Sequence, residues 1–303
     1  MNLLLTGANK YSDKQIEELS GLGYEVTYVQ DERIPLKEQG IDPCIFDAVV
    51  CNGLFLYNNI DEFTSLKVIQ LTSAGFDRVP LEKIQERGIK IYNARGVYSI
   101  PMAEFAVSGV LQLYKQSAFF YENQKIKNWE KNRNVLELFG KQVCIVGCGS
   151  VGTECAKRFV AFGCKVVGVD IVSFKSDFYD KMVSLNELDD VLKESDIVVL
   201  TLPLTDETTN LFDSSRFDMM KDGVVLVNIA RGRIVSEEAL IKALGKKLHG
   251  AVLDVFELEP LSCESELWNM PNVIVTPHNS FVGEGNRTRL WDVIFENLRG
   301  INN

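Results

Sequence analysis

The chain contains only two histidines, which narrows the search for a proton donor. His278 follows Thr276 and Pro277 at the end of an apolar run, whereas His249 lies in a charged segment that enters another apolar run. Imidazole is the side chain that most readily exchanges a proton near neutral pH. We therefore expect His278, rather than His249, to perform acid–base chemistry.

Two charged residues follow apolar runs in a similar way. Arg231 comes after the run at 224–228, and Glu259 lies just past the run at 250–254. A guanidinium offers a planar fork of donors that suits a carboxylate or a carbonyl oxygen. The carboxyl ends of strands in open α/β sheets face the ligand crevice, so these groups could meet there with His278. The spacing alone equally allows a surface ion-pair set with a hydrogen-bonded histidine.

Residues 147–152 form a glycine-rich loop, G-x-G-x-x-G, between an apolar run at 143–146 and a helical pattern. In such a loop Gly147 permits a tight turn, Gly149 lets the backbone approach a pyrophosphate, and Gly152 lets the helix pack on the strand. The helix N-terminus favours the negative charge of the phosphates. The pattern predicts a dinucleotide site, and a plain glycine turn between buried strands is the alternative.

Asp170 ends the next apolar run, close to the usual offset of about 20 residues beyond such a loop. An acid at this position accepts hydrogen bonds from the hydroxyls of the adenine ribose. Because a carboxylate repels a 2′-phosphate, NAD is favoured over NADP. Lys175 leaves NADP open, since a cation there could reach a phosphate, and Asp170 could instead be a solvated strand-end residue.

Short apolar runs alternate with amphipathic stretches along the whole chain, which is typical of βαβ units around a parallel sheet. We expect helices at 13–20, opened by Ser12 or Asp13 as a cap, and at 81–87. A longer helical pattern spans 101–126, and a last one at 284–298 should return to the first domain. Strands are expected at 3–5, 25–29, 48–51, 68–71, 90–92, 143–146, 165–169, 197–200, 224–228, 250–253 and 273–275.

Composition excludes several classes of partner. The net charge of −10 argues against nucleic acid and anionic membranes. No apolar run reaches the roughly 18 residues of a membrane-spanning helix, and the first seven residues lack the features of a signal peptide. Seven cysteines without zinc or disulfide spacing predict free thiols in the cytoplasm and no metal site.

Five segments together resemble the D-isomer-specific 2-hydroxyacid dehydrogenase family, and they keep its order over most of the chain: residues 147–152, 202–205, 228–235, 250–260 and 276–278. The resemblance implies an α/β protein with a Rossmann-type doubly wound NAD domain at 103–275. This domain is inserted into a flavodoxin-like, split substrate-binding domain made of 1–102 plus 276–303. It also implies a homodimer built largely through the NAD domains.

The resemblance also implies roles for individual residues. Arg231, Glu259 and His278 match the family's catalytic residues, and Asp254 matches the carboxylate that holds the nicotinamide amide. The family's substrate carboxylate lies on a loop that matches Ser73, Ala74 and Gly75, while Arg231 and His278 contact the substrate as well. The expected cofactor-binding residues are Gly147, Gly149, Ser150, Val151, Gly152, Asp170, Leu202, Pro203, Thr208, Ile229, Ala230, Arg231, Asp254 and His278.

The implied function is hydride transfer between NAD(H) and a small 2-oxo or 2-hydroxy acid, acting on a CH–OH group, with the D-isomer expected. A glyoxylate or hydroxypyruvate reductase and a short phosphoglycerate dehydrogenase are both open, and an NAD(H)-sensing, corepressor-like binding protein is the alternative from another class. Residues 52–57 occupy the place where the family packs against the variable group of the substrate. Candidate contacts to that group are Phe55, Tyr57, Arg78, Arg95 and Tyr98.

Overall fold

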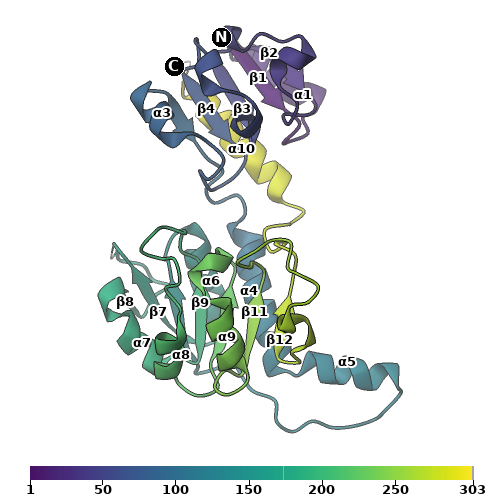
Figure 1. Cartoon of the computed structure of the whole chain (residues 1–303), viewed down its shortest axis with the longest axis vertical. Coiled ribbons are helices and arrows are strands. Elements are labelled where there is room, and N and C mark those ends of the chain that lie inside the picture. The colour runs from purple at the N-terminus through teal and green to yellow at the C-terminus, as the bar shows by residue number, and fades with distance from the viewer. Residues whose placement is uncertain (173, 302–303) are drawn as a thin grey trace. The chain divides into compact units, whose positions relative to one another are not determined.

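The computed structural model describes residues 1–172 and 174–301 as two compact units, each built on a parallel sheet (Figure 1). The first unit comprises Met1–Tyr98 and the segment that starts at Gly283, and the second comprises Ser99–Val282. These limits lie a few residues from the expected 102/103 and 275/276. The second unit is longer at both ends because α4 (Ser99–Tyr114) packs against its α6 (Ser150–Ala161), and because residues 276–280 hydrogen-bond to its Asp254.

The sheet of the first unit has the strand order β2-β1-β3-β4-β5. This is the order of flavodoxin-like folds, in which the chain reverses direction across the sheet between β1 and β3. The elements of this unit are β1 (Asn2–Thr6), α1 (Asp13–Gly21), β2 (Glu25–Val29), β3 (Ala48–Cys51), α2 (Leu54–Tyr57), β4 (Val68–Leu71), α3 (Leu81–Glu86), β5 (Lys90–Tyr92) and α10 (Asn286–Arg299).

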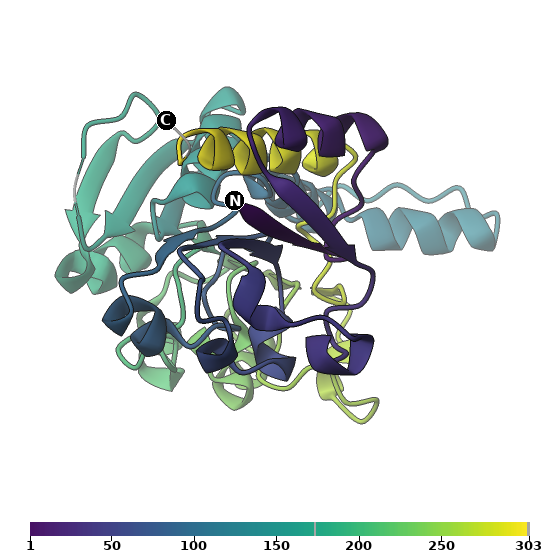
Figure 2. The ribbon, with the colours of Figure 1, turned by 90° about the horizontal axis from the view of Figure 1, so that it is seen from above.

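Helices cover both faces of this sheet. Leu3 and Leu5 of β1 pack with Ile294 of α10 on one face, where α1 and α10 lie together (Figure 2). Leu4 points to the opposite face and packs with Ile84 of α3. Successive side chains of a strand alternate between faces, so β1 needs an unbroken apolar run.

The sheet of the second unit has the order β12-β11-β10-β9-β6-β7-β8. It is the Rossmann order with a further strand at one edge, which confirms the expected doubly wound fold. Strands β9, β10 and β11 are buried throughout because helices cover both faces. Besides α4 and α6, the elements are α5 (Ser117–Lys125), β6 (Gln142–Val146), β7 (Lys165–Asp170), β8 (Lys181–Ser184), α7 (Leu188–Glu194), β9 (Ile197–Leu200), α8 (Ser214–Met219), β10 (Val225–Asn228), α9 (Glu237–Leu244), β11 (Gly250–Leu253) and β12 (Val273–Val275).

The single helix expected at 101–126 is wrong, because the structure divides it into α4 and α5. Gln116 adopts a left-handed backbone with φ of 56° at the break. A later segment of the chain hydrogen-bonds to the C-terminal end of α4. Leu136 N–H donates to Tyr114 O at 2.9 Å, and Lys115 Nζ donates to Leu136 O at 2.7 Å. This partner lies about 20 residues away, so the local helical pattern does not reveal it.

Candidate active site

Three neighbouring strands of the second unit carry the candidate catalytic segments to one edge of the sheet. β10 pairs with β11 and β11 pairs with β12, so that Asn228 lies beside Leu253 and Leu253 beside Val275. Arg231 and His278 therefore follow the carboxyl ends of the two strands that flank β11. This edge is the one that faces ligands in open α/β sheets.

His278 and Glu259 form a hydrogen-bonded pair. Nδ1 of His278 lies 2.8 Å from Oε2 of Glu259, and Oε1 of Glu259 accepts the N–H of Phe256 at 3.2 Å. The two side chains are 43% and 38% exposed, so a small ligand can reach them. Because Glu259 engages Nδ1, proton exchange with a ligand is directed to Nε2.

The backbone of His278 is strained. Its φ is 51°, in the left-handed region that residues other than glycine rarely adopt. Its N–H donates to Asp254 O at 2.8 Å and to Thr276 O at 3.0 Å. Such a conformation persists only where the surroundings hold it, and strained residues of this kind cluster at functional sites.

Asp254 is the group that holds the loop around His278. Its carboxylate is fully buried, and Oδ1 accepts Thr276 Oγ1 at 2.6 Å and Asn279 N at 2.7 Å, while Oδ2 accepts Ser280 N at 2.9 Å. A buried carboxylate must be compensated by hydrogen bonds, and here all three come from the loop. Asp254 thus orders the histidine segment, while the nicotinamide contact expected for it stays a prediction, because the carboxylate is fully buried among these donors.

Asn228 shapes the turn that presents Arg231. The Asn228 side chain is almost completely buried, accepts Ala230 N at 3.1 Å and donates to Arg231 O at 3.1 Å. Nη1 of Arg231 donates to Ala230 O at 2.8 Å. A Cβ added to Gly232 would lie 1.9 Å from the carbonyl carbon of Phe256, so this turn packs directly on the segment after β11.

The glycine loop is tightly packed on the protein side and open at one position. A Cβ added to Gly147, whose φ is 93°, would lie 2.6 Å from Leu202 N, and one added to Gly152 would lie 2.1 Å from Gly147 O. A Cβ on Gly149 would meet nothing within 4 Å. Ser150 and Val151 then form the first turn of α6, whose 12 residues give it a sizeable dipole. This arrangement fits a pyrophosphate.

Asp170 ends β7 and is tied to the same loop. Its Oδ2 accepts the N–H of Cys148 at 2.6 Å. Burial, with a smaller contribution from the Asp170 carboxylate, raises the pKa of the Cys148 thiol to about 12. The thiol is therefore neutral at pH 7 and adds no charge where phosphates would bind. Lys175, which left NADP open, is exposed on the segment after β7.

The remaining expected cofactor residues line the ends of β9 and β10. Leu202, Ile229 and Ala230 are buried. Thr208 closes the loop after β9, because its Oγ1 donates to Pro203 O at 2.8 Å and accepts Thr205 N at 2.7 Å. Among the described residues, no group of three or more His, Cys, Asp or Glu side chains could hold a metal ion. No helix within residues 1–172 and 174–301 is long and apolar enough to cross a membrane.

Residues 73–75 follow β4 in the first unit, and their shape is set within that unit. Ser73 Oγ donates to Gly75 O at 3.0 Å, Asn93 Nδ2 donates to Ala74 O at 2.7 Å, and Ala94 N donates to Ser73 O at 2.9 Å. The carbonyl oxygens of the loop are therefore engaged by neighbours of the same unit.

Three residues that order the site were missed at the sequence level: Asn228, Thr276 and Ser280. Asn228 acts on the backbone of its own turn, and the other two act on a carboxylate more than 20 positions away. The only available signal was that each lies within three residues of Arg231 or His278.

The family model described as "D-isomer specific 2-hydroxyacid dehydrogenase, NAD binding domain" matches residues 107–280. A hydroxypyruvate reductase of Thermotoga maritima is 36% identical over 223 residues, which is 72% of this chain and 72% of that protein. A D-3-phosphoglycerate dehydrogenase of Archaeoglobus fulgidus is 36% identical over 216 residues, 71% of this chain but only 41% of that protein. The crystal structure of a glyoxylate reductase from Paecilomyes thermophila superposes with a TM-score of 0.84 at 26% identity, covering 100% of this chain and 95% of that one.

Proposed function

The chain belongs to the D-isomer-specific 2-hydroxyacid dehydrogenase family and is an NAD-dependent oxidoreductase of 2-hydroxy acids, and on that premise we propose which residues perform the reaction. Arg231, Glu259 and His278 are the proposed catalytic residues. The observation that carries the proposal is the hydrogen bond of 2.8 Å between Glu259 and His278, on a buried support at the carboxyl edge of the sheet. A binding protein without catalysis is not favoured.

Each residue has a distinct role in reduction of a 2-oxo acid. When bound, NADH supplies a hydride to the carbonyl carbon. The guanidinium of Arg231 binds the carboxylate and the carbonyl oxygen and polarises the carbonyl bond. Protonated His278 donates a proton from Nε2 to the carbonyl oxygen, and Glu259 orients the ring through Nδ1. Oxidation runs the same steps in reverse, with neutral His278 accepting the hydroxyl proton.

We assign the rest of the site in the same way. The glycine loop and Asp170 bind the pyrophosphate and the adenine ribose, and residues 73–75 bind the substrate carboxylate through backbone N–H groups. Ser99–Val282 is thus the proposed cofactor-binding unit, and the first unit is the substrate-binding unit. Residues 52–57, at the next strand end, face the variable group of the substrate.

Glyoxylate and hydroxypyruvate are the proposed substrates, with achiral glycolate and D-glycerate as the respective products. The names of two similar proteins, a hydroxypyruvate reductase and a glyoxylate reductase, support this choice. A phosphorylated 2-oxo acid is the second candidate, because two arginines lie near the proposed substrate loop in the sequence. Arg78 is in the segment that follows β4, and Arg95 is in the segment that precedes α4. Arginine forks suit phosphate well.

The test is NADH oxidation with glyoxylate, hydroxypyruvate, pyruvate and phosphohydroxypyruvate as alternative substrates. We expect turnover of the first two and opposite pH dependence of the two directions, since reduction needs the protonated ring and oxidation the neutral one. The pH dependence is measured on kcat/KM in each direction. A wild-type protein that binds NADH but reduces none of these acids would contradict the proposal.

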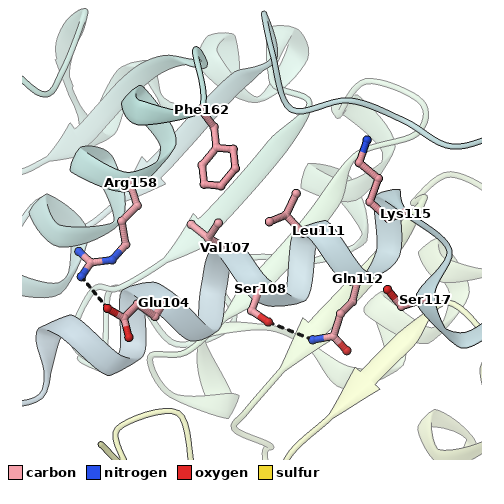
Figure 3. Close-up of a pocket in the computed structure, with 9 residues that line it drawn as sticks. All are labelled: Glu104, Val107, Ser108, Leu111, Gln112, Lys115, Ser117, Arg158 and Phe162. Carbon is pink, nitrogen blue, oxygen red and sulfur yellow. Dashed lines mark hydrogen bonds and ion pairs between the residues drawn. The ribbon is translucent and has the colours of Figure 1, made fainter. Parts of the chain in front are cut away.

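We further propose a homodimer formed by the second unit. A groove of about 540 Å³ lies between α4 and α6, with Val107, Leu111 and Phe162 in its wall and the Glu104–Arg158 ion pair at its side (Figure 3). The segment around α5, which extends away from the sheet of this unit (Figure 1), carries further apolar side chains: Ile126 is 72% exposed and Trp129 95%. Phe139, just before β6, is 78% exposed. Apolar surface of this extent is typical of protein contacts, and a symmetric dimer covers it on both copies at once.

Light scattering tests the dimer. Trp129→Lys should shift the protein toward the monomer, whereas Ile34→Lys, at a side chain of the first unit that is 44% exposed, should not. A monomeric wild type would overturn this part of the proposal. The seven free cysteines fit a reducing compartment, and we propose the cytoplasm.

A further inference from the structure

Glu32 is a buried charge in the first unit that the proposed reaction does not use. Its side chain lies just beyond β2, and the residue is only 9% exposed. The carboxylate accepts the hydroxyl of Thr6 at 2.6 Å, the N–H of Asn52 at 3.1 Å and the N–H of Gly53. All three donors are neutral. Burying a carboxylate costs free energy, and hydrogen bonds from specific donors must offset that cost.

These bonds connect three strand ends. β2 and β3 flank β1 in the sheet, and Thr6 is the last residue of β1. Glu32 therefore reaches from the end of β2, past the end of β1, to the backbone that follows β3. A Cβ added to Gly53 would lie 3.4 Å from Oε1 of Glu32, so the carboxylate is in contact with the N-cap residue of α2.

The segment that Glu32 holds adjoins the proposed carboxylate-binding loop. Cys51 pairs with Leu71 in the sheet, and Thr72 N–H donates to Cys51 O at 2.9 Å. Residues 52–57 and 73–75 thus leave the sheet side by side. A short acid bound through its carboxylate at 73–75 would place its variable group near the neighbouring strand end.

Within this segment the side chains divide into two groups. Phe55 turns into the unit, where its ring packs edge-on against Phe63 with centroids 5.3 Å apart. Leu56 and Tyr57 are 58% and 47% exposed. Phe55 is therefore better explained as core than as a substrate contact, and the orientation of the whole turn depends on the backbone anchored at Asn52 and Gly53.

We propose that Glu32 is a positioning residue for substrate selection, which fixes the turn at 52–57 against the variable group of the 2-oxo acid. The inference rests on the proposed function. Glyoxylate has only a hydrogen in place of that group, so its reduction should not depend on the turn. Pyruvate and hydroxypyruvate carry a larger group, and their reduction should.

The decisive variant is Glu32→Gln, which keeps the shape of the side chain. Either orientation of the amide directs its NH₂ at a hydrogen-bond donor, because both oxygens of Glu32 accept backbone N–H groups. We expect kcat/KM for hydroxypyruvate to fall about tenfold relative to kcat/KM for glyoxylate, with the Kd of NADH unchanged. Glu38→Gln, at an exposed glutamate of the same unit, is the matched control and should leave the ratio unchanged.

Thr6→Val provides a second, milder variant, since it removes one donor and leaves the carboxylate in place; it should shift the ratio in the same direction by about twofold to threefold. If Glu32→Gln fails to fold, as judged by its melting curve, this variant decides. Equal losses for both acids, or no loss for either, would overturn the positioning role while leaving the proposed function intact. A wild-type protein that reduces no 2-oxo acid would overturn both.

Discussion

In the seven-stranded sheet, similar residue types lie at the amino ends and at the carboxyl ends of the strands, but their surroundings differ. At the amino end, the Asp196 carboxylate accepts Gln142 N at 3.0 Å and pairs with Lys221 at 2.6 Å. His249 precedes β11 there, and its ring lies edge-on to buried Tyr114 with centroids 5.7 Å apart. Asp196 thus joins neighbouring elements through its two polar partners, and the ring of His249 packs against the core.

At the carboxyl end the charged groups are held but stay accessible. The side chains of His278 and Glu259 are both more than one third exposed, although the loop that carries His278 is anchored on a fully buried carboxylate. The comparison shows that position along a strand, more than residue type, separates the histidine that packs on a buried ring from the one that stays accessible to a ligand. In open α/β sheets the loops at the carboxyl edge form the ligand crevice, and such loops can vary while the core stays the same.

The largest expected effect separates the two histidines. His278→Ala should lower kcat for 2-oxo acid reduction by about 10²–10⁴-fold, because the proton donor is lost. The kcat of His249→Ala should stay within about twofold of the wild-type value, since the ring of His249 only packs against Tyr114. Stopped-flow measurement of NADH oxidation, with NADH binding followed by fluorescence, checks both. Equal activity of the two variants would remove the distinction.

Arg231→Lys tests the guanidinium at the carboxyl end. We expect kcat/KM to fall about 10²–10³-fold, because an ammonium cannot bind two oxygens in one plane. Steady-state kinetics with glyoxylate measure the change. An unaltered KM and kcat would show that a point charge suffices.

Asp254→Asn tests the buried support of the His278 loop. The amide directs a donor at a backbone N–H of the loop, so kcat should fall about 10–100-fold. Thr276→Val, which removes one donor but keeps the carboxylate, should cause a smaller loss without changing the Kd of NADH. If only NADH binding changed in Asp254→Asn, the residue would serve the cofactor alone.

The smallest effect is expected at the amino end. Although burial opposes it, hydrogen bonds from Lys221 and the backbone of Gln142 lower the pKa of Asp196 below its usual value. A lowered pKa in the folded state adds stability above the unfolded pKa, and this is lost as the pH falls through the folded pKa. Asp196→Asn should therefore cost about 1 kcal/mol at pH 7, less in acid, and no activity. Urea unfolding at several pH values tests it, and a pH-independent difference would contradict the linkage.

Much of this architecture follows from local pattern. Continuous apolar runs predicted the buried strands, because a parallel sheet covered on both faces tolerates no polar side of a strand. The glycine loop and Asp170 were recognisable since a tight turn, a helix N-terminus and a strand end follow each other within one βαβ unit. The same logic placed His278 at the carboxyl edge and His249 away from it.

Other features were decided only by the tertiary structure. The break at Gln116, the carboxylate of Asp254 beneath the His278 loop and the bridge from Glu32 to Gly53 all depend on hydrogen-bond partners distant in the chain. Periodicity reports which face of an element is buried, but a buried polar group takes whatever donor the fold brings to it. Which distant groups become hydrogen-bond partners therefore depends on how the strands are ordered in the sheets.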